Sequence, residues 1–184
     1  MILHSGGYIL VEGQSDKLFV DRILLPEILA RRPGLYVKSV EHAEKSSKLV
    51  RGIVGTATKS GKHYVFLCDL DNCSCYGLKR TESTNKYPCL DRTRIVVVNR
   101  EIESWYLAGL DSTCCHDLGI PFIPRTDGIT KERFAEMRPS RLRTNLDFML
   151  EILDLYDLQH ALSEARSGSL AYFCANHCNL SLAS

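Results

Sequence analysis

The chain has 184 residues, with 23 lysines and arginines against 22 aspartates and glutamates and a formal net charge of +1. This length suits one domain, or one domain with a helical appendage, and it can bury a sizeable core. Hydrophobic residues make up 45% of the chain and charged residues 24%, which excludes wholesale disorder. The near-zero charge argues against a histone-like protein, but it is compatible with a nucleic-acid site confined to one part of the surface.

The amino-terminal residues predict a cytoplasmic protein. They contain no basic leader, and the first acidic residue is Glu12. No window approaches the roughly 18 apolar residues of a membrane span, so we expect no membrane association. In the cytoplasm the eight cysteines are expected to be reduced thiols rather than a disulfide framework.

Short apolar runs alternate with segments of helical periodicity from residue 8 onward. The apolar runs predict strands at 8–11, 35–40, 63–68 and 94–98, and the periodic segments predict helices at 15–31, 44–58 and 101–110. Ser15 is expected to cap the first helix, which should break near Pro26. Continuously apolar strands indicate a parallel sheet covered by helices on both faces.

The remaining residues predict a polar insertion and a helical tail. Residues 72–92 are polar and interrupt the strand–helix alternation, and after Asp111 the pattern changes to a loop followed by helices. One of these helices should bury an apolar stripe formed by Leu146, Met149, Leu150, Leu153 and Tyr156. We therefore expect an α/β core over residues 1–112, with a helical extension over 113–184 packed on it.

Three acidic residues follow predicted strands. Glu12 comes directly after the first strand, and Asp69 and Asp71 follow the third. Because ligands of parallel α/β sheets bind outside the carboxyl ends of the strands, these carboxylates should converge there. In an extended segment, the i, i+2 spacing would put Asp69 and Asp71 on one side. Converging carboxylates repel one another, so the pattern predicts a divalent cation, Mg²⁺ or Mn²⁺, bound through oxygen ligands.

These residues carry a resemblance to a known superfamily. A strand followed by Glu12-Gly13, then a strand followed by Asp69-Leu70-Asp71, resembles the TOPRIM domain of topoisomerases, bacterial primases and OLD-type nucleases. Residues 9–16 (ILVEGQSD) and 99–108 (NREIESWYLA) are similar to the small stand-alone TOPRIM proteins of prokaryotes, with a fainter echo at 167–173 (SGSLAYF). The resemblance implies a Rossmann-like parallel sheet with a Mg²⁺-dependent site for phosphodiester chemistry, often linked to phage defence.

The resemblance also has limits. The segment 72–92 contains three cysteines that are not typical of the superfamily. The chain shows neither the tyrosine-bearing domain of a topoisomerase nor the ATPase module of OLD proteins. Strand passage by this chain alone is therefore not expected.

The site roles follow from the chemistry and from the resemblance. Asp69 and Asp71 are the expected metal ligands, and by resemblance Glu12 is either a ligand or the general acid/base. Glu103 could complete a second metal position, or it could simply be an acid favoured in the first turn of a helix. Trp105 is expected to pack in the core rather than to stack on bases.

Basic residues near the expected site are candidate phosphate contacts. Arg100 could clamp a phosphate or pair with a neighbouring carboxylate, and Lys79 and Arg80 could contact the nucleic-acid backbone or remain solvated.

The cysteines offer a weaker alternative. Cys73, Cys75 and Cys89 could hold zinc, but they lack the usual x₂ pairs and no histidine lies within 72–92, so zinc is not expected.

The sequence favours a Mg²⁺-dependent nuclease acting on DNA or RNA. One alternative is a non-catalytic TOPRIM module that binds or regulates and needs a partner ATPase, another protein or nucleic acid. Primase-type nucleotidyl transfer is a second alternative, although it would require a nucleotide-binding site that the sequence does not reveal. The residues do not distinguish DNA from RNA, cleavage within strands from cleavage at ends, one metal from two, or one oligomeric state from another.

Overall fold

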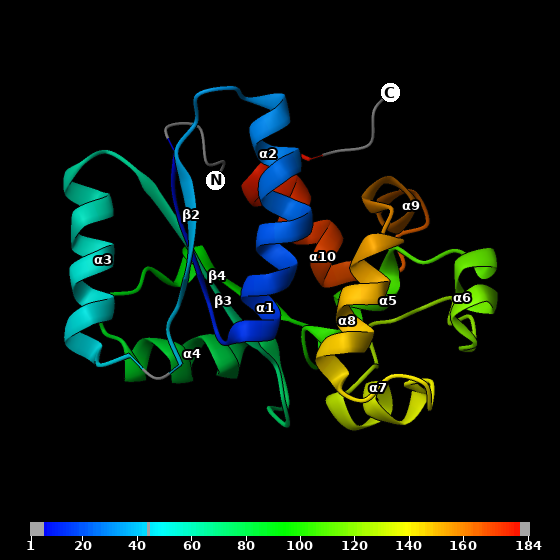
Figure 1. Ribbon diagram of the computed structural model, residues 1–184. Helices are drawn as coiled ribbons and strands as arrows, with labels where there is room; N and C mark the ends of the chain where they lie inside the picture. Colours follow the sequence, from blue (N-terminus) through cyan, green and yellow to red (C-terminus); the bar gives the residue numbers. More distant parts are fainter. Residues whose placement is uncertain (1–5, 44, 181–184) are drawn as a thin grey trace.

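Four parallel strands form the central sheet of the computed structural model, which describes residues 6–43 and 45–180 (Figure 1). The order across the sheet is β2-β1-β3-β4, with β1 at Gly7–Val11, β2 at Val37–Glu41, β3 at His63–Asp69 and β4 at Ile95–Val98. The register pairs Val11 with Glu41 and Asp69 with Val98, so the strands end together at the lower edge of the sheet in Figure 1. The expected α/β class with a parallel central sheet is confirmed.

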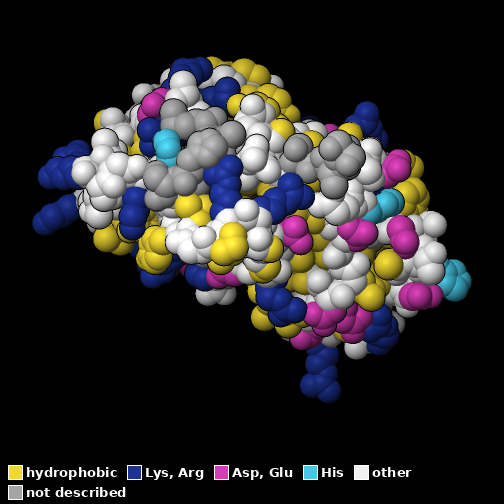
Figure 2. All heavy atoms as spheres, turned by 90° about the horizontal axis from the view of Figure 1, so that it is seen from above, with side chains coloured by type: hydrophobic (Ala, Val, Ile, Leu, Met, Phe, Trp, Pro, Cys, Tyr) yellow, Lys and Arg dark blue, Asp and Glu magenta, His cyan; other side chains and the backbone are white. Residues whose placement is uncertain are grey.

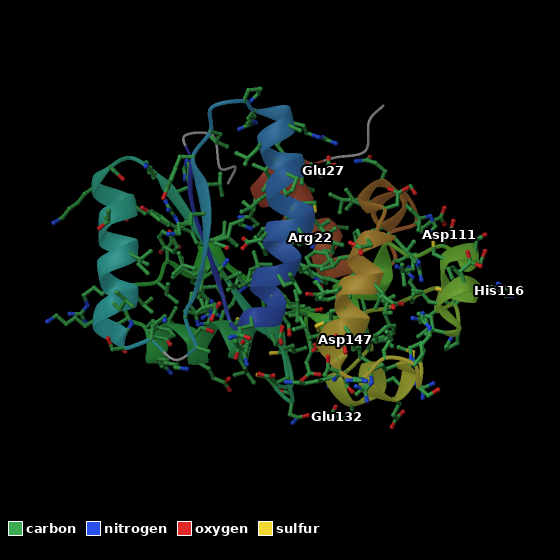
Figure 3. The ribbon with its side chains drawn as sticks, viewed as in Figure 1. Arg22, Glu27, Asp111, His116, Glu132 and Asp147 are labelled. Atoms are coloured by element: carbon green, nitrogen blue, oxygen red, sulfur yellow. The ribbon has the colours of Figure 1, made fainter. Side chains whose placement is uncertain are left out.

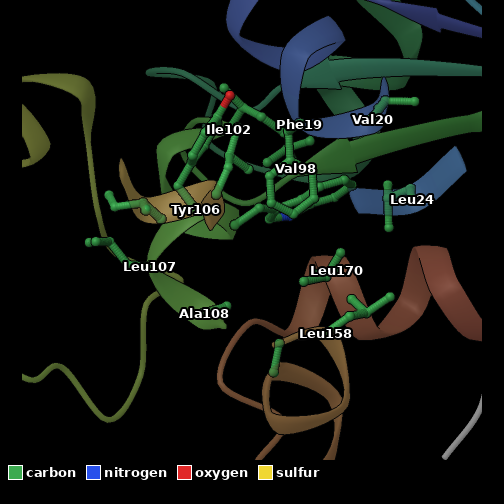
Figure 4. Close-up of a cluster of buried hydrophobic side chains, with 14 of the residues drawn as sticks. Phe19, Val20, Leu24, Val98, Ile102, Tyr106, Leu107, Ala108, Leu158 and Leu170 are labelled. Carbon is green, nitrogen blue, oxygen red and sulfur yellow. The ribbon is translucent and has the colours of Figure 1, made fainter. Parts of the chain in front are cut away.

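Helices connect the strands and cover both faces of the sheet. The connections contain α1 at Gln14–Phe19, α2 at Leu25–Arg31, α3 at Ser47–Lys59 and α4 at Tyr76–Lys86, and α5 follows β4 at Glu103–Ala108. Alternate strand residues enter two separate cores, because successive side chains of a strand point to opposite faces. Leu10 and Phe66 pack with α3, whereas Ile9 and Val98 pack with Phe19 and the other buried side chains of Figure 4.

The first helix begins one residue earlier than expected and is locally widened. It starts at Gln14 with Gly13 at the cap position, so the prediction that Ser15 caps it is wrong. The segment Val20–Leu24 is a π-helical turn (η1), and Pro26 lies in the first turn of α2. Proline has no N–H to donate, so the break that the sequence predicted near Pro26 takes the form of this wide turn.

The polar segment 72–92 contains the crossover helix α4. Parallel neighbours such as β3 and β4 need a crossover connection, which is usually helical. Within α4 the buried residue is Ser83, so the helix has little apolar periodicity that could reveal it. Tyr87 and Leu90, just beyond the helix, supply the buried apolar surface of this segment.

Residues 112–180 form a mainly helical part, as expected. Its elements are α6 at Ser112–Leu118, α7 at Lys131–Met137, α8 at Asn145–Asp154, α9 at Leu158–Ser163, α10 at Gly168–Phe173 and the π-helical turn η3 at Cys174–Cys178. The predicted stripe on α8 is only partly right, because Leu146 is 55% exposed while Phe148 and Ile152 are fully buried. These buried residues share one apolar cluster with the sheet residue Val98.

Charge is distributed unevenly between the two parts of the fold. Figure 2 views the molecule from above, opposite to the carboxyl ends of the strands. Lys and Arg prevail over the sheet at the left, and Asp and Glu gather among further basic side chains over the helical part at the right. Within residues 6–43 and 45–180, no helix is both long and apolar enough to cross a membrane.

Two glycines provide a matched test of the packing. A Cβ on Gly109 would lie 2.6 Å from the ring of Tyr156, whose hydroxyl is anchored on the Trp105 carbonyl at 3.0 Å. Gly109→Ala should therefore lower the free energy of unfolding by about 1–3 kcal/mol in urea denaturation. Gly55 lies inside α3 with open space around it, so Gly55→Ala should raise that free energy by about 0.5–1 kcal/mol. Equal effects of the two substitutions would contradict this packing.

Candidate active site at the carboxyl edge of the sheet

A cavity of about 270 Å³ lies where β1 and β3 end. Six carboxylates and one lysine line it. These side chains come from the strand ends, the first turns of α1 and α5, and the start of α7. They are Glu12, Asp16, Asp69, Asp71, Glu101, Glu103 and Lys131. The cavity therefore contains all four acidic residues that the sequence singled out. We call it the acidic cavity.

Glu12 links the ends of β1 and β3. Its Oε2 accepts a hydrogen bond from the backbone N–H of Asp69 at 3.2 Å. The neighbouring Gly13 N–H donates to Oδ2 of Asp16, also at 3.2 Å. Backbone donors therefore fix one oxygen of each of these two carboxylates and leave the other oxygen to face the cavity or the protein interior.

Asp69 is the last residue of β3, and its carboxyl group lacks a full set of partners. Its Oδ1 is buried and has no hydrogen-bond partner. Burial, together with the negative charges of Asp16, Glu12 and Glu103, raises the pKa of Asp69 to about 9. Without a cation, this carboxyl group is mostly protonated at neutral pH.

Asp16 is a member of the site to which sequence reasoning assigned no role. The residue is 4% exposed, and its Oδ1 is buried without a partner. Burial raises its pKa to about 7 against the opposing hydrogen bond from Gly13, and the charges of Glu12 and Glu103 contribute to the rise. The sequence signal for this role is an acidic residue in the first turn of the helix. Because the helix starts at Gln14, Asp16 lies in that turn, close to the end of β1. The expected cap at Ser15 placed the helix start too late to predict this.

Asp71 lines the acidic cavity together with Asp69, but its carboxylate is paired with a lysine. The chain bends after β3, because the N–H groups of Leu70 and Asp71 donate to the carbonyls of Val98 and Arg100 at 2.9 and 3.0 Å. Asp71 has a left-handed backbone with φ of 51°, and its carboxylate forms an ion pair with Lys79. The segment is therefore not extended as expected, although Asp69 and Asp71 both line the acidic cavity.

Glu103 lies at a position compatible with either of its sequence-based interpretations. It lies in the first turn of α5 and also lines the acidic cavity, where it is 3% exposed. Burial raises its pKa, and the charge of Glu101 acts in the same direction while Lys131 opposes it. Glu101 itself accepts a hydrogen bond from the backbone N–H of Lys131.

The three basic residues proposed from the sequence occupy different positions. Lys79 is engaged by Asp71, and Arg100 donates from Nη1 to the Asp71 carbonyl at 3.4 Å. Arg80 donates from Nε to the Ile95 carbonyl at 3.2 Å, which places it along β4 rather than in the acidic cavity. Lys131, in contrast, lines the cavity but was not singled out, because no predicted strand end precedes it.

His42 is a further residue that sequence reasoning missed. It follows β2, and its Nε2 lies 2.8 Å from the Leu67 carbonyl while its ring stacks on Phe66 at 4.0 Å. Its Nδ1 is buried without a partner, and burial lowers its pKa. His42 and Glu12 line a second cavity of about 130 Å³ beside the acidic one.

The donor set of the acidic cavity fits a hard divalent cation, although its side chains are spread apart. Across residues 6–43 and 45–180, no three His, Cys, Asp or Glu side chains converge closely enough to hold a metal ion. The buried, unpartnered Oδ1 atoms of Asp16 and Asp69 are nevertheless oxygen donors of the kind that Mg²⁺ and Mn²⁺ take. Mutual repulsion among carboxylates opposes their close approach when no cation is present.

Cys75 and Trp105 have structural roles in this arrangement. All eight cysteines are free thiols, and the Cys75 sulfur caps α4 by accepting from the Leu78 N–H. Trp105 is fully buried and donates to Ser169 Oγ at 2.9 Å, which confirms core packing.

Figure 3 shows His116 on α6 far out at the right, whereas Glu132 and Asp147 lie at the lower end, on the side of the carboxyl edge.

The raised pKa values predict how stability depends on pH. An unfolded aspartate has a pKa of about 3.9, below the values of about 7 for Asp16 and about 9 for Asp69 in the fold. Between these limits the folded state binds more protons, so the free energy of unfolding should fall as pH rises from about 4 to about 9. Asp69→Asn should remove much of this fall and stabilise the metal-free protein by on the order of 1–2 kcal/mol at pH 8.

Urea denaturation in EDTA at several pH values measures this effect. Asp117→Asn is the matched control, because Asp117 has a side chain that is 69% exposed on α6. A stability gain from Asp69→Asn that is the same at pH 5 and pH 8 would contradict the assignment.

No protein-family model, no curated protein and no solved structure matches this chain. Its function is therefore inferred from the arrangement of its own residues.

Proposed function

We propose that this protein is a Mg²⁺- or Mn²⁺-dependent nuclease that uses a TOPRIM-like acidic site to cleave phosphodiester bonds in DNA or RNA. The observation that supports the proposal is the acidic cavity, in which burial and mutual repulsion raise the pKa values of Asp16 and Asp69. Groups with strongly shifted pKa values in a cleft are typical of functional sites. A bound divalent cation would compensate this repulsion.

Each carboxylate has a role that follows from its surroundings. Asp16 and Asp69 would hold the cation through their unpartnered oxygens, and Asp71 or Glu103 would complete the set. The bound cation would neutralise charge at the scissile phosphate and activate a water molecule. Glu12, fixed by the Asp69 N–H, would serve either as a further ligand or as the general acid/base.

Basic side chains around the cavity would orient the phosphate backbone. Lys131 is exposed and lines the acidic cavity, and Arg100 is exposed beside Asp71. Lys79 holds the Asp71 carboxylate in the metal-free protein. When Asp71 turns toward a cation, the ammonium of Lys79 would be released to contact phosphate.

Cleavage assays test this function directly. With Mg²⁺ or Mn²⁺ the protein should degrade labelled single-stranded or duplex DNA or RNA, and EDTA should abolish the activity. Asp69→Asn and Glu12→Gln should each lower the rate at least about 100-fold, because each removes charge from the reacting centre. Asp117→Asn should cleave at the wild-type rate.

Thermal unfolding tests metal binding separately from catalysis. Mg²⁺ or Mn²⁺ at 100 times its Kd should stabilise the protein by about 2.7 kcal/mol. For a chain of this size each kcal/mol corresponds to roughly 2–4 °C in Tm. Asp16→Asn and Asp69→Asn should reduce the metal-induced shift, whereas Asp117→Asn should retain it.

The two experiments together separate the alternatives. A metal-induced shift in Tm without cleavage of any nucleic acid would favour a binding or regulatory module that needs a partner. Absence of both effects would reject the metal site itself. Incorporation of labelled nucleotides on a single-stranded template would favour nucleotidyl transfer.

A further inference from the structure

A third cavity, distinct from the two at the carboxyl ends of the strands, lies beside the edge strand β4. It measures about 240 Å³ and is lined by Tyr76, Arg80, Val97, Gly168, Ser169 and Tyr172. These residues come from three elements, because α4 and α10 both pack against β4. This volume is below the roughly 300–1,000 Å³ of drug-sized pockets, so the cavity suits a single ring system. We call it the edge cavity.

Two tyrosines give the edge cavity its chemical character. Tyr76 is 44% exposed and Tyr172 is 46% exposed, so the fold leaves much of both rings in contact with water. Tyr76 begins α4, and Tyr172 lies on α10, which places aromatic surface on both sides of the cavity. Exposed aromatic rings beside a cavity are typical of binding sites, where they supply large contact areas at low entropic cost.

The other side chains of the cavity add polar specificity. Arg80 is anchored through Nε on the Ile95 carbonyl, which fixes the guanidinium group at the cavity. Guanidinium groups interact with both the faces and the acceptor edges of planar rings. Ser169 presents a hydroxyl that already accepts from the Trp105 indole and from the Asn99 N–H, so it is held rigidly. The lining therefore combines aromatic faces with fixed hydrogen-bonding groups.

The edge cavity and the acidic cavity are connected by the chain at and after the end of β4, because Val97 lines the edge cavity and residues 101–103 line the acidic cavity. Ser169 accepts from the N–H of Asn99 at 3.1 Å, and the next residue, Arg100, donates to the Asp71 carbonyl. The short segment that follows Asp71 leads directly into Tyr76. A nucleic-acid strand whose phosphate reaches the acidic cavity would therefore have a neighbouring base within reach of the edge cavity.

We propose that the edge cavity binds an unpaired nucleobase next to the scissile phosphate, and that the substrate is therefore single-stranded nucleic acid or a single-stranded end. The proposal rests on the proposed nuclease function, which it deepens by naming the substrate class. Aromatic side chains hold the bases of single strands by stacking, largely without regard to sequence. A base inside a duplex is already stacked and paired, so it cannot enter such a cavity without being flipped out.

Oligonucleotide binding tests the edge cavity without requiring cleavage. The probes are single-stranded DNA and RNA of about 12 nucleotides, and strands of equal length in which the central positions are abasic. Affinity is measured by fluorescence anisotropy with the full chain, in buffer that contains Ca²⁺ in place of Mg²⁺ or Mn²⁺. Tyr76→Ala and Tyr172→Ala should each weaken binding of the intact strands roughly tenfold through loss of stacking. Binding of the abasic strands should change much less.

Two controls isolate the role of the aromatic rings. Tyr76→Phe and Tyr172→Phe keep the rings, so they should bind within about twofold of wild type. Tyr36 is 51% exposed but lies just before β2, at the opposite edge of the sheet. Tyr36→Ala should therefore leave affinity unchanged. Urea denaturation of each variant confirms that these exposed positions do not alter folding.

The outcomes separate this proposal from the nuclease proposal. If wild type binds no strand, or if the two alanine variants bind like wild type while cleavage persists, the edge cavity does not hold a base. If the alanine variants bind like wild type while cleavage persists, contact with a protein partner would be the remaining role for the two tyrosines. Equal weakening for intact and abasic strands would also overturn the proposal. Base-dependent binding that both alanine variants lose, in a protein that cleaves nothing with Mg²⁺ or Mn²⁺, would support the edge cavity and reject the nuclease function.

Discussion

The parallel pairing of the four strands is the constraint on which the candidate site depends. Because all four strands run in the same direction, their carboxyl ends lie at the same edge of the sheet. Each connection must therefore return across a face of the sheet. Glu12, His42 and Asp69 are far apart in the sequence but all lie at that edge. The same constraint requires a crossover helix between β3 and β4, and this helix supplies both Lys79 and Tyr76. The fold thereby places acidic, basic and aromatic groups around the carboxyl ends of the strands.

Burial and repulsion set the electrostatics of that edge. Asp16 and Glu103 are buried, and burial raises the pKa of both carboxyl groups. Asp71, at the rim of the same cavity, forms an ion pair with Lys79. The acidic cavity is therefore costly to ionise in the metal-free fold, which is the condition under which a divalent cation has the most to contribute.

Sequence reasoning succeeded where a residue's position depends on its own segment. The apolar runs before Glu12 and Asp69 marked two strand ends, and Trp105 was correctly assigned to the core. It failed where a cap or turn decides the direction of a side chain. The helix starts at Gln14 rather than being capped by Ser15, which brings Asp16 into the cavity, and Asp71 has a left-handed backbone in place of the expected extended one. Neither the helix start nor the backbone conformation of Asp71 can be predicted from the periodicity of apolar residues.

The sequence by itself determined the α/β class, the strands that make up the sheet and the strand ends that carry Glu12 and Asp69, because these follow from local patterns of apolar and polar residues. Only the tertiary structure decided which groups meet there. Lys131 lines the acidic cavity from the helical part, and Tyr172 and Tyr76 line one cavity beside the edge strand, through contacts between segments that are distant in the chain. Such contacts depend on how helices pack on the sheet, and no local pattern encodes that packing.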